Sequence, residues 1–358
     1  MKIFAVAAFA VGILINPSGA ALAAKEALVS CVNSVIPSLF PFFVCSRMLI
    51  ELGAAEKLGK LIFPVMKPVF GVGGGGGLAF VLGILSGYPV GAATVADLVK
   101  NGRCTKSEGE KLLGYCNNSG PLFILGALGA GLLGNTALGW ILYASHILSA
   151  LTIALLMRKI PCKTSCAGQS EAALSTKHFG EIMAEAVGNA AQSVFTVCGF
   201  VIMFSILANS LEFFGVFRLF SFAGINYGIC RAFVFGLLEP VGGCVLAANT
   251  FSGLPVVRCM ALSAVLGWSG ISVHLQVLGI IKKAGLSAKY YFFGKMGMAA
   301  VSPVYTYVLM KLFPHVSTAA VFSPSNMASA VPYPYISWFI CISVIVALIM
   351  QLIPLKKC

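Results

Sequence analysis

Charged residues are scarce in this sequence of 358 residues, where Asp, Glu, Lys and Arg together make up 10% of the chain. Soluble domains carry about 25%. Six stretches contain none of these residues: 3–24, 68–96, 112–157, 186–211, 259–281 and 312–355. Apolar runs of about 18 residues or more are typical of membrane spans, because no charged stripe is left to face water. The scarcity excludes a soluble enzyme and a secreted disulfide scaffold, and it predicts an all-α polytopic membrane protein.

Acidic residues are fewer than basic ones, 11 against 24. The basic residues lie mostly in short connections between apolar stretches, which is the pattern that orients spans in a bilayer. No compact basic face is visible, so we expect the lipid bilayer and no nucleic acid as a partner. The sequence also lacks a clustered set of metal ligands, a nucleotide-binding motif, and a Ser or Cys nucleophile beside a base. We therefore expect no metal, no cofactor and no enzyme activity.

Basic flanks predict the path of the first half through the bilayer. Residues 77–99 have Lys57, Lys60 and Lys67 before them and Lys100 and Arg103 after them. The stretch should therefore enter and leave by the same, cytoplasmic face. Its centre, 86–91, reads Ser-Gly-Tyr-Pro-Val-Gly, and Pro and Gly both interrupt helices. We predict a re-entrant hairpin, followed by a span over 112–134 that is broken at 117–121.

The second half of the chain repeats these features. Phe80–Leu85 followed by Pro-Val-Gly matches Phe233–Leu238 followed by Pro-Val-Gly, and Asn118-Ser119-Gly120 matches Trp268-Ser269-Gly270. With Ser34 and Ser193, the offsets are 159, 153 and 150 residues in order along the chain. Charge counting places the second half upside down relative to the first. The predicted fold is two inverted repeats, each with a re-entrant helical hairpin and a broken transmembrane helix.

These patterns divide the chain into five segments. Residues 1–33 form an N-terminal membrane helix with an interfacial segment, and we favour its retention over cleavage as a signal peptide. The first repeat covers 34–158. A cytoplasmic linker and interfacial helix cover 159–192, and the second repeat covers 193–313. Residues 314–358 form an outer loop and a C-terminal membrane helix. Oligomeric state is not indicated.

Broken helices expose backbone amides and carbonyls at membrane depth, where a solute can pair with them. Half-helix N-termini favour an anionic group, so we expect a small anionic substrate. The candidate substrate-binding residues are those at the four breaks: Ser86, Gly87, Tyr88, Gly91, Asn117, Asn118, Ser119, Gly120, Gly242, Gly243, Ser269, Gly270, His274 and Gln276.

Glu239 is the candidate for binding a coupling proton or cation, because an ionisable group at this depth indicates function. The alternative is an outer-rim Glu239 paired with Arg231. Asn117–Ser119 have an alternative as local caps of the broken helix. His274 has one as an ordinary hydrogen-bonded histidine. A local ion pair of Arg47 with Glu51 accounts for those two residues.

Three motifs of the first half resemble a known family: Pro-Ser-Leu-Phe-Pro-Phe-Phe at 37–43, Ser-Gly-Tyr-Pro-Val-Gly-Ala at 86–92, and Asn-Asn-Ser-Gly-Pro-Leu-Phe at 117–123. They resemble the YlbJ (SpoVV) family of sporulation integral membrane proteins, within the nucleoside-recognition, or gate, domain group. The resemblance implies export of dipicolinic acid from the mother cell toward the forespore, across the outer forespore membrane. A nucleoside or ion carrier of the gate group is one alternative, and a non-transporting scaffold for sporulation assembly is another.

Overall fold

The computed structural model describes residues 2–52, 66, 70–73, 76–162, 178–218, 224 and 226–318, and every regular element within them is helical. Three helical segments are long and apolar enough to cross a membrane: Thr136–Arg158, Phe179–Phe213 and Pro255–Lys283. A bent pair, Val6–Ile15 with Pro17–Asn33, is a fourth if it counts as one span. The predicted C-terminal helix at 335–355 and the linker from 163 to 177 lie outside the described residues.

The N-terminal segment is two helices at a steep angle. Helix α1 (Lys2–Ile15) ends at Asn16, and α2 (Pro17–Ser30) leaves it with a bend of 102°. The Asn16 side chain accepts a hydrogen bond of 3.1 Å from the Gly19 amide, so it caps α2. Helix α2 continues through a π-helical stretch, Cys31–Val35 (η1), into α3 (Ile36–Glu51). The sequence predicted a membrane helix here, and the structure adds the sharp corner at Asn16.

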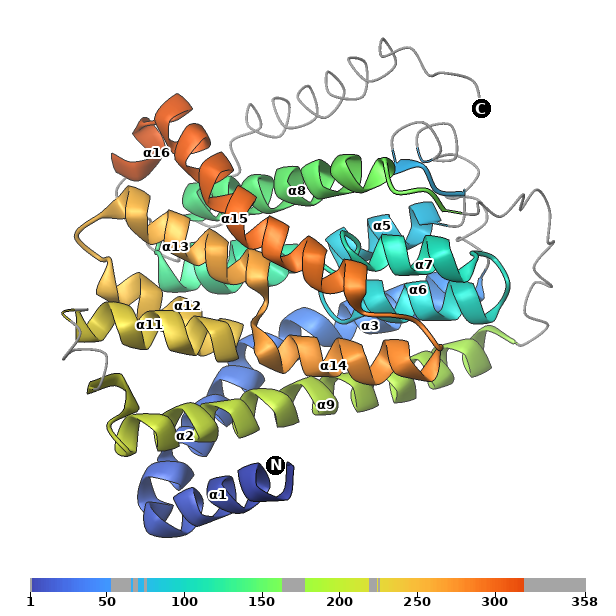
Figure 1. The fold of residues 1–358 in the computed structure, drawn as a ribbon. Coiled ribbons are helices and arrows are strands. Elements are labelled where there is room, and N and C mark those ends of the chain that lie inside the picture. The colour runs from blue at the N-terminus through green and yellow to red at the C-terminus, as the bar shows by residue number, and fades with distance from the viewer. Residues whose placement is uncertain are drawn as a thin grey trace.

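Two helical hairpins lie at opposite ends of the bundle (Figure 1). The first is α5 (Gly76–Leu85) with α6 (Val90–Lys100), and the second is α11 (Tyr227–Leu238) with α12 (Pro240–Thr250). Both turns fall where Gly and Pro predicted them. Glycine lets the two arms of each hairpin approach closely, because a Cβ on Gly243 would collide with the backbone of Gly236. In Figure 1 the tip of each hairpin lies toward the centre of the molecule.

Two further helices are interrupted and run beside the hairpins. Helix α7 (Lys106–Leu113) is followed by non-helical residues and then by the π-helical stretch Leu122–Leu132 (η3). Helix α13 (Pro255–Trp268) gives way at Ser269 to α14 (Gly270–Lys283). Ser269 has a left-handed backbone with φ of 75°. The chain thus leaves the helix at both predicted places.

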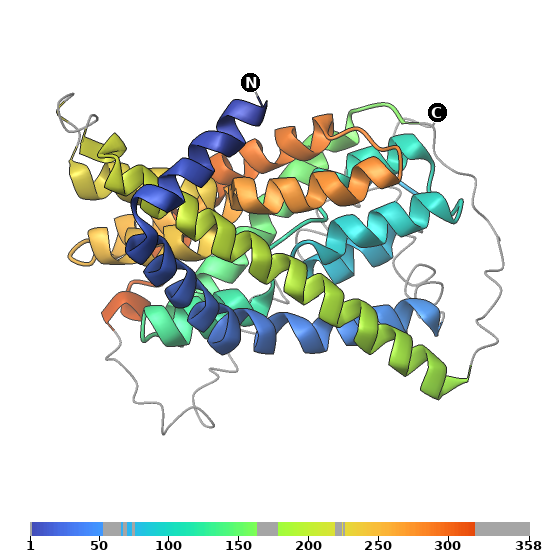
Figure 2. The same ribbon diagram turned by 90° about the horizontal axis from the view of Figure 1, so that it is seen from below.

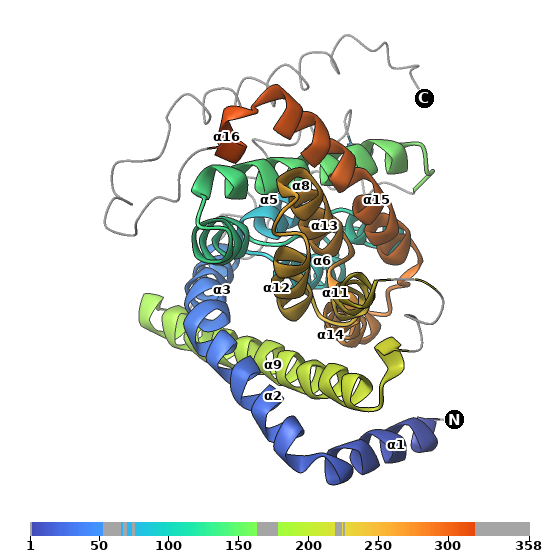
Figure 3. The ribbon, with the colours of Figure 1, turned by 90° about the vertical axis from the view of Figure 1, so that its left-hand side faces the viewer.

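The remaining long helices enclose these elements. Helix α8 (Thr136–Arg158) and α15 (Lys289–Leu312) pack on each other and on α13, and a short α16 (His315–Thr318) follows. Helix α9 (Phe179–Phe213) runs along one face of the bundle over its whole length (Figure 2) and crosses α2 and α3 (Figure 3). The sequence predicted a separate interfacial helix ending at residue 192. The structure instead has one continuous helix there, because nothing at 188–196 breaks it.

Arg47 of α3 is paired with a residue far away in sequence. Its Nη1 lies 2.9 Å from Oδ2 of Asp97 on α6, so α3 is tied to the first hairpin. The local pair with Glu51 that the sequence suggested is therefore not the partner that the structure shows. Spacing within one helix favours a neighbour four residues on, but the fold brings a carboxylate of another helix within reach.

Candidate functional site

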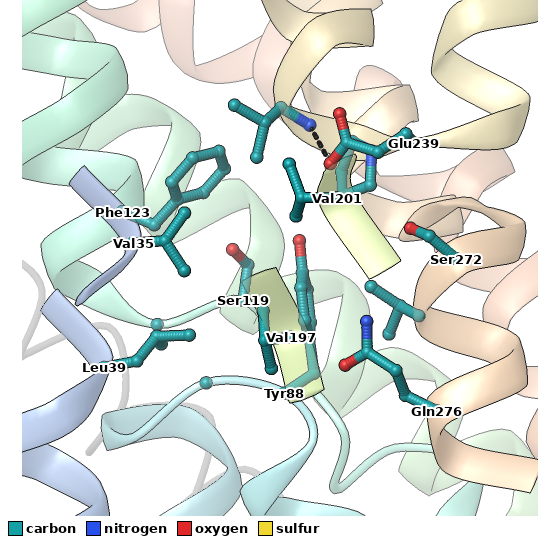
Figure 4. A pocket seen from close by; sticks show the side chains of 15 residues that line it. Val35, Leu39, Tyr88, Ser119, Phe123, Val197, Val201, Glu239, Ser272 and Gln276 are labelled. Atoms are coloured by element: carbon teal, nitrogen blue, oxygen red, sulfur yellow. Dashed lines mark hydrogen bonds between the residues drawn. The ribbon is translucent and has the colours of Figure 1, made fainter. Parts of the chain in front are cut away.

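Three of the four helix interruptions line one small cavity near the centre of the bundle, and the helix that follows the fourth lines it as well (Figure 4). Gly87 and Tyr88 line it from the first break and Ser119 and Gly120 from the second. Glu239 lines it from the third, and Ser272 and Gln276 follow the fourth on α14. Its volume is about 40 Å³, which is room for about three water molecules. This space is smaller than an organic solute.

The breaks pack against each other backbone to backbone, in two pairs. A Cβ on Gly87 (φ 82°) would lie 2.9 Å from the amide nitrogen of Gly120. A Cβ on Gly270 (φ 77°) would lie 2.8 Å from Cδ of Pro240. Both glycines combine a left-handed backbone with a contact that no larger residue allows. The first break is therefore joined to the second, and the third to the fourth.

Glu239 lies at the tip of the second hairpin and caps α12. Its carboxylate accepts hydrogen bonds from the Val241 amide at 2.9 Å and the Gly242 amide at 2.6 Å. The residue is 3% exposed, and a helix N-terminus stabilises such a carboxylate. Arg231 lies 2.9 Å from Glu212 instead. The alternative of an outer-rim Glu239 paired with Arg231 is therefore wrong.

A tyrosine faces this carboxylate across the cavity. Figure 4 shows the Tyr88 hydroxyl pointing from the first break toward Ser119 and Glu239. Tyr88 and Ser119 are close enough to interact through their side chains. The polar groups of the two break pairs therefore face one space from opposite sides.

The predicted residues divide into those that line the cavity and those behind its wall. The lining ones are Gly87, Tyr88, Ser119, Gly120, Glu239 and Gln276. The others shape the breaks or lie behind them: Ser86, Gly91, Asn117, Asn118, Gly242, Gly243, Ser269, Gly270 and His274. Ser272 and Val273 line the cavity without having been predicted, because they lie inside a regular helix and carry no sequence signal.

Neighbouring polar residues at the second break differ in their hydrogen bonds. Asn118 donates from Nδ2 to the Tyr115 carbonyl at 2.8 Å, which is the local capping bond of the alternative interpretation. Asn117 is 0% exposed, and both its side-chain nitrogen and its oxygen lack a hydrogen-bond partner. Buried amide groups are rarely left unpaired. Asn118 has an unpaired oxygen as well, but only Asn117 has both a donor and an acceptor free for a ligand.

Two buried residues near the breaks were missed by the sequence interpretation. His146 of α8 accepts a hydrogen bond of 3.0 Å at Nε2 from the Ser119 amide. Lys295 of α15 is 0% exposed, and its Nζ has no hydrogen-bond acceptor. The available signal for Lys295 was its position inside an apolar stretch, since an ionisable residue within a span indicates function.

Two larger cavities adjoin the central one. A cavity of about 510 Å³ shares Val197 and Gln276 with it and extends to Arg47, Lys100 and Lys283. A second, of about 570 Å³, shares Phe123 and Val241 with it. This second cavity extends toward Asn33 and Gly131. The three spaces lie in series, with the small one in the middle.

The fold and these cavities are those of an integral membrane protein with hairpins and broken helices around a buried polar centre. Residues 32–113, which include the first hairpin, match the Gate family, described as nucleoside recognition. Over 325 residues the chain is 30% identical to the sporulation integral membrane protein YlbJ of Bacillus subtilis (strain 168), and the match covers 84% of this chain and 79% of that protein. The chain therefore belongs to the YlbJ family, which confirms the resemblance seen in its motifs. No solved structure matches it.

Proposed function

We propose that this protein is a secondary transporter of a small organic anion, with dipicolinate as the substrate. One observation carries the proposal: three helix interruptions and the helix after a fourth, drawn from both halves of the chain, line a single cavity. Backbone groups left unpaired at such depth are costly unless something binds them. A transported solute and a coupling ion are suitable partners, and secondary transporters place their sites at helix breaks of this kind.

We further propose that residues 34–158 and 193–313 are inverted repeats. The hairpins at opposite ends of the bundle support this (Figure 1), as do the two packed break pairs, Gly87 with Gly120 and Pro240 with Gly270. Inversion provides a mechanism, since exchanging the conformations of two similar halves turns an inward-open state into an outward-open one. The cavities in series are then successive parts of one route. The 510 Å³ cavity at the basic end is the cytoplasmic entrance.

The helix N-termini at the cavity differ in a way that separates an anion from a cation. No side chain caps the start of α6, η3 or α14, whereas Glu239 occupies the start of α12. Uncapped N-termini supply amide donors and partial positive charge to an anionic group. The Glu239 carboxylate repels an anion and suits a proton or a cation. In this proposal the substrate binds at the uncapped N-termini, and Glu239 binds the coupling ion.

Dipicolinate is proposed because it is a small planar dianion and because the relative is named a sporulation protein. Its route in this proposal runs from the mother cell across the outer forespore membrane. Since the central cavity of about 40 Å³ is smaller than such a molecule, binding requires the break pairs to separate. The structure described above then corresponds to a closed state between the two cavities.

A nucleoside carrier is the second candidate, and the match of residues 32–113 to a nucleoside-recognition family favours it. A non-transporting sporulation scaffold is a third. Carrier and scaffold differ at the second break, because only a carrier needs the unpaired Asn117 side chain. Replacing Asn117 by Ala should abolish the activity of a carrier and leave a scaffold working.

The deciding experiment is uptake into vesicles that contain the purified protein. Labelled dipicolinate and labelled uridine are offered separately, with and without an imposed pH gradient, and protein-free vesicles serve as the control. The proposal expects dipicolinate uptake well above the control and uridine uptake equal to it. Uridine uptake alone supports the nucleoside carrier. Uptake of neither substrate under any gradient contradicts the transport proposal.

A further inference from the structure

Lys295 carries a buried amine that the surrounding protein leaves without a hydrogen-bond acceptor. It lies on α15, is 0% exposed, and its Nζ makes no hydrogen bond. Lys111, at 1% exposure, is equally buried but lies close to the carbonyls of Gly71, Arg158 and Ile160 at 3.3 to 3.4 Å. A buried ammonium is costly without such partners. The contrast shows that this fold can satisfy a buried lysine and does not do so at Lys295.

The groups around Lys295 are also incompletely paired. Lys295 is close enough to His146 on α8 and His274 on α14 to interact with both electrostatically. His274 Nδ1 lies 2.7 Å from the Tyr291 hydroxyl, and the Asn117 side chain is close to Tyr291 without the geometry of a hydrogen bond. Nδ1 of His146, Nε2 of His274 and both side-chain polar atoms of Asn117 have no hydrogen-bond partner. These five residues, which we term the Lys295 cluster, come from four segments of the chain.

The Lys295 cluster lies directly behind the wall of the central cavity. Ser119 lines the cavity and donates its amide to His146, while Val273 lines it and precedes His274. Helix α15 is pressed against the end of α7, because a Cβ on Gly294 would collide with the Gly114 carbonyl. Ser119 and Val273 therefore connect the cluster to the wall of the cavity that Glu239 also lines.

The cluster contains no acidic side chain. Two carboxylates elsewhere are paired with arginines, Asp97 with Arg47 and Glu212 with Arg231. The acid that lines the cavity, Glu239, accepts hydrogen bonds from the amides of α12. A lysine with two histidines and an amide, and with no carboxylate among them, is complementary to an anion. A carboxylate has the two acceptor oxygens that these donors lack.

We propose that the Lys295 cluster binds a carboxylate group of the transported substrate, with Lys295 as its counter-charge and Asn117 as a hydrogen-bond donor. This inference rests on the proposed function. It adds Lys295, which lies on α15 outside the helix breaks, to the residues that bind the substrate. The substrate reaches the cluster when the segment at Ser119 and Gly120 moves aside, which joins the cluster to the cavity. The second carboxylate of a dicarboxylate then lies at the uncapped start of α14. One carboxylate is bound by the side chains of the Lys295 cluster and the other by the backbone amides of α14.

The test is ligand binding to the full-length protein in detergent, followed by thermal unfolding. The probes are pyridine-2,6-dicarboxylate, pyridine-2-carboxylate and uridine. The variants are Lys295→Met, Lys295→Arg and the matched control Lys289→Met, whose lysine is exposed at the start of the same helix. We expect Lys295→Met to weaken dicarboxylate binding at least tenfold. Lys295→Arg should keep part of the affinity, and Lys289→Met should bind like the wild type.

The outcomes distinguish a failure of the Lys295 site from a failure of the proposed function. Equal dicarboxylate affinity of the wild type and Lys295→Met overturns the site and leaves anion transport standing. Stabilisation of the wild type by uridine and by neither carboxylate overturns both. If Lys295→Met does not fold, Asn117→Ala tests the same cluster. It should weaken pyridine-2-carboxylate binding several-fold, and wild-type affinity in that variant would refute the site.

Discussion

The amide of Ser119 donates a hydrogen bond of 3.0 Å to Nε2 of His146, 27 residues further along the chain. An accepting Nε2 means that the neutral ring carries its proton on Nδ1. The bond fixes the second helix break to α8, which has no interruption of its own. The break is thereby held at a defined place although its own residues form no regular structure.

His146→Ala should lower stability because the Ser119 amide is then buried without an acceptor. Such a loss costs about 1–3 kcal/mol, which thermal unfolding in detergent measures. Ser145→Ala is the matched control on the same helix, since its hydroxyl donates only to the Ile141 carbonyl one turn away. Equal unfolding temperatures for the two variants would show that the bond from Ser119 contributes nothing.

Replacement of Glu239 should separate its capping role from its charge. Glu239→Ala removes the cap of α12 and should cost about 1 kcal/mol of stability. Glu239→Gln keeps an acceptor oxygen for one of the two amides but turns an NH2 donor toward the other, so its stability should lie between those of Glu239→Ala and the wild type. Both variants should lose the dependence of uptake on a pH gradient. Glu212→Gln is the control, and gradient-dependent uptake by Glu239→Gln contradicts the coupling role.

Gly270→Ala should destabilise the junction of the third and fourth breaks. Its φ of 77° and the 2.8 Å approach to Pro240 both oppose a side chain, so a cost of about 1–3 kcal/mol is expected. A Cβ at Gly199 on α9 would have no atom within 4 Å, so Gly199→Ala should keep or raise stability. The comparison needs only unfolding temperatures. Tolerance of alanine at Gly270 would mean that the two breaks are not tightly packed.

The Arg47–Asp97 ion pair should contribute little to stability. The two side chains are 38% and 34% exposed, and such pairs contribute about 0.2–1 kcal/mol. A double-mutant cycle with Arg47→Met and Asp97→Asn measures the coupling energy of the pair directly. This coupling energy should decrease at high salt. The same variants should leave dicarboxylate affinity unchanged, because the pair lies at the basic mouth of the 510 Å³ cavity and away from the breaks. A coupling well above this range would assign the pair a structural role.

The helix breaks could be predicted from the sequence because their causes are local. Proline at 89, glycines at 87 and 91, and the Asn-Asn-Ser-Gly-Pro run each combine several residues that disfavour a helix within a few positions. The same local signals predicted that Glu239 lies at a hairpin tip. The positions of the helix breaks in the sequence can therefore be predicted from the backbone preferences of a few neighbouring residues.

Partnerships across the fold could not be predicted in this way. Nothing near Arg47 in sequence identifies Asp97 as its partner, and nothing near His146 identifies Ser119. Lys295 is the instructive case, since burial without an acceptor is visible only when α8, α14 and α15 are seen together. The helix end expected at residue 192 is absent, while the interfacial position of 178–192 stays a prediction. A change in polarity along α9 marks a change in environment, and the helix continues through it.

Helix α9 has 35 residues, and at 1.5 Å per residue it is about 52 Å long. A hydrocarbon layer is about 30 Å thick, so this rod must tilt steeply or stand out of the lipid at one end. Its residues Val197 and Val201 line the central cavity, and Val197 also lines the cavity of about 510 Å³. If the protein transports as proposed, a small tilt of this rigid helix would change the width of the central cavity and of its 510 Å³ neighbour together.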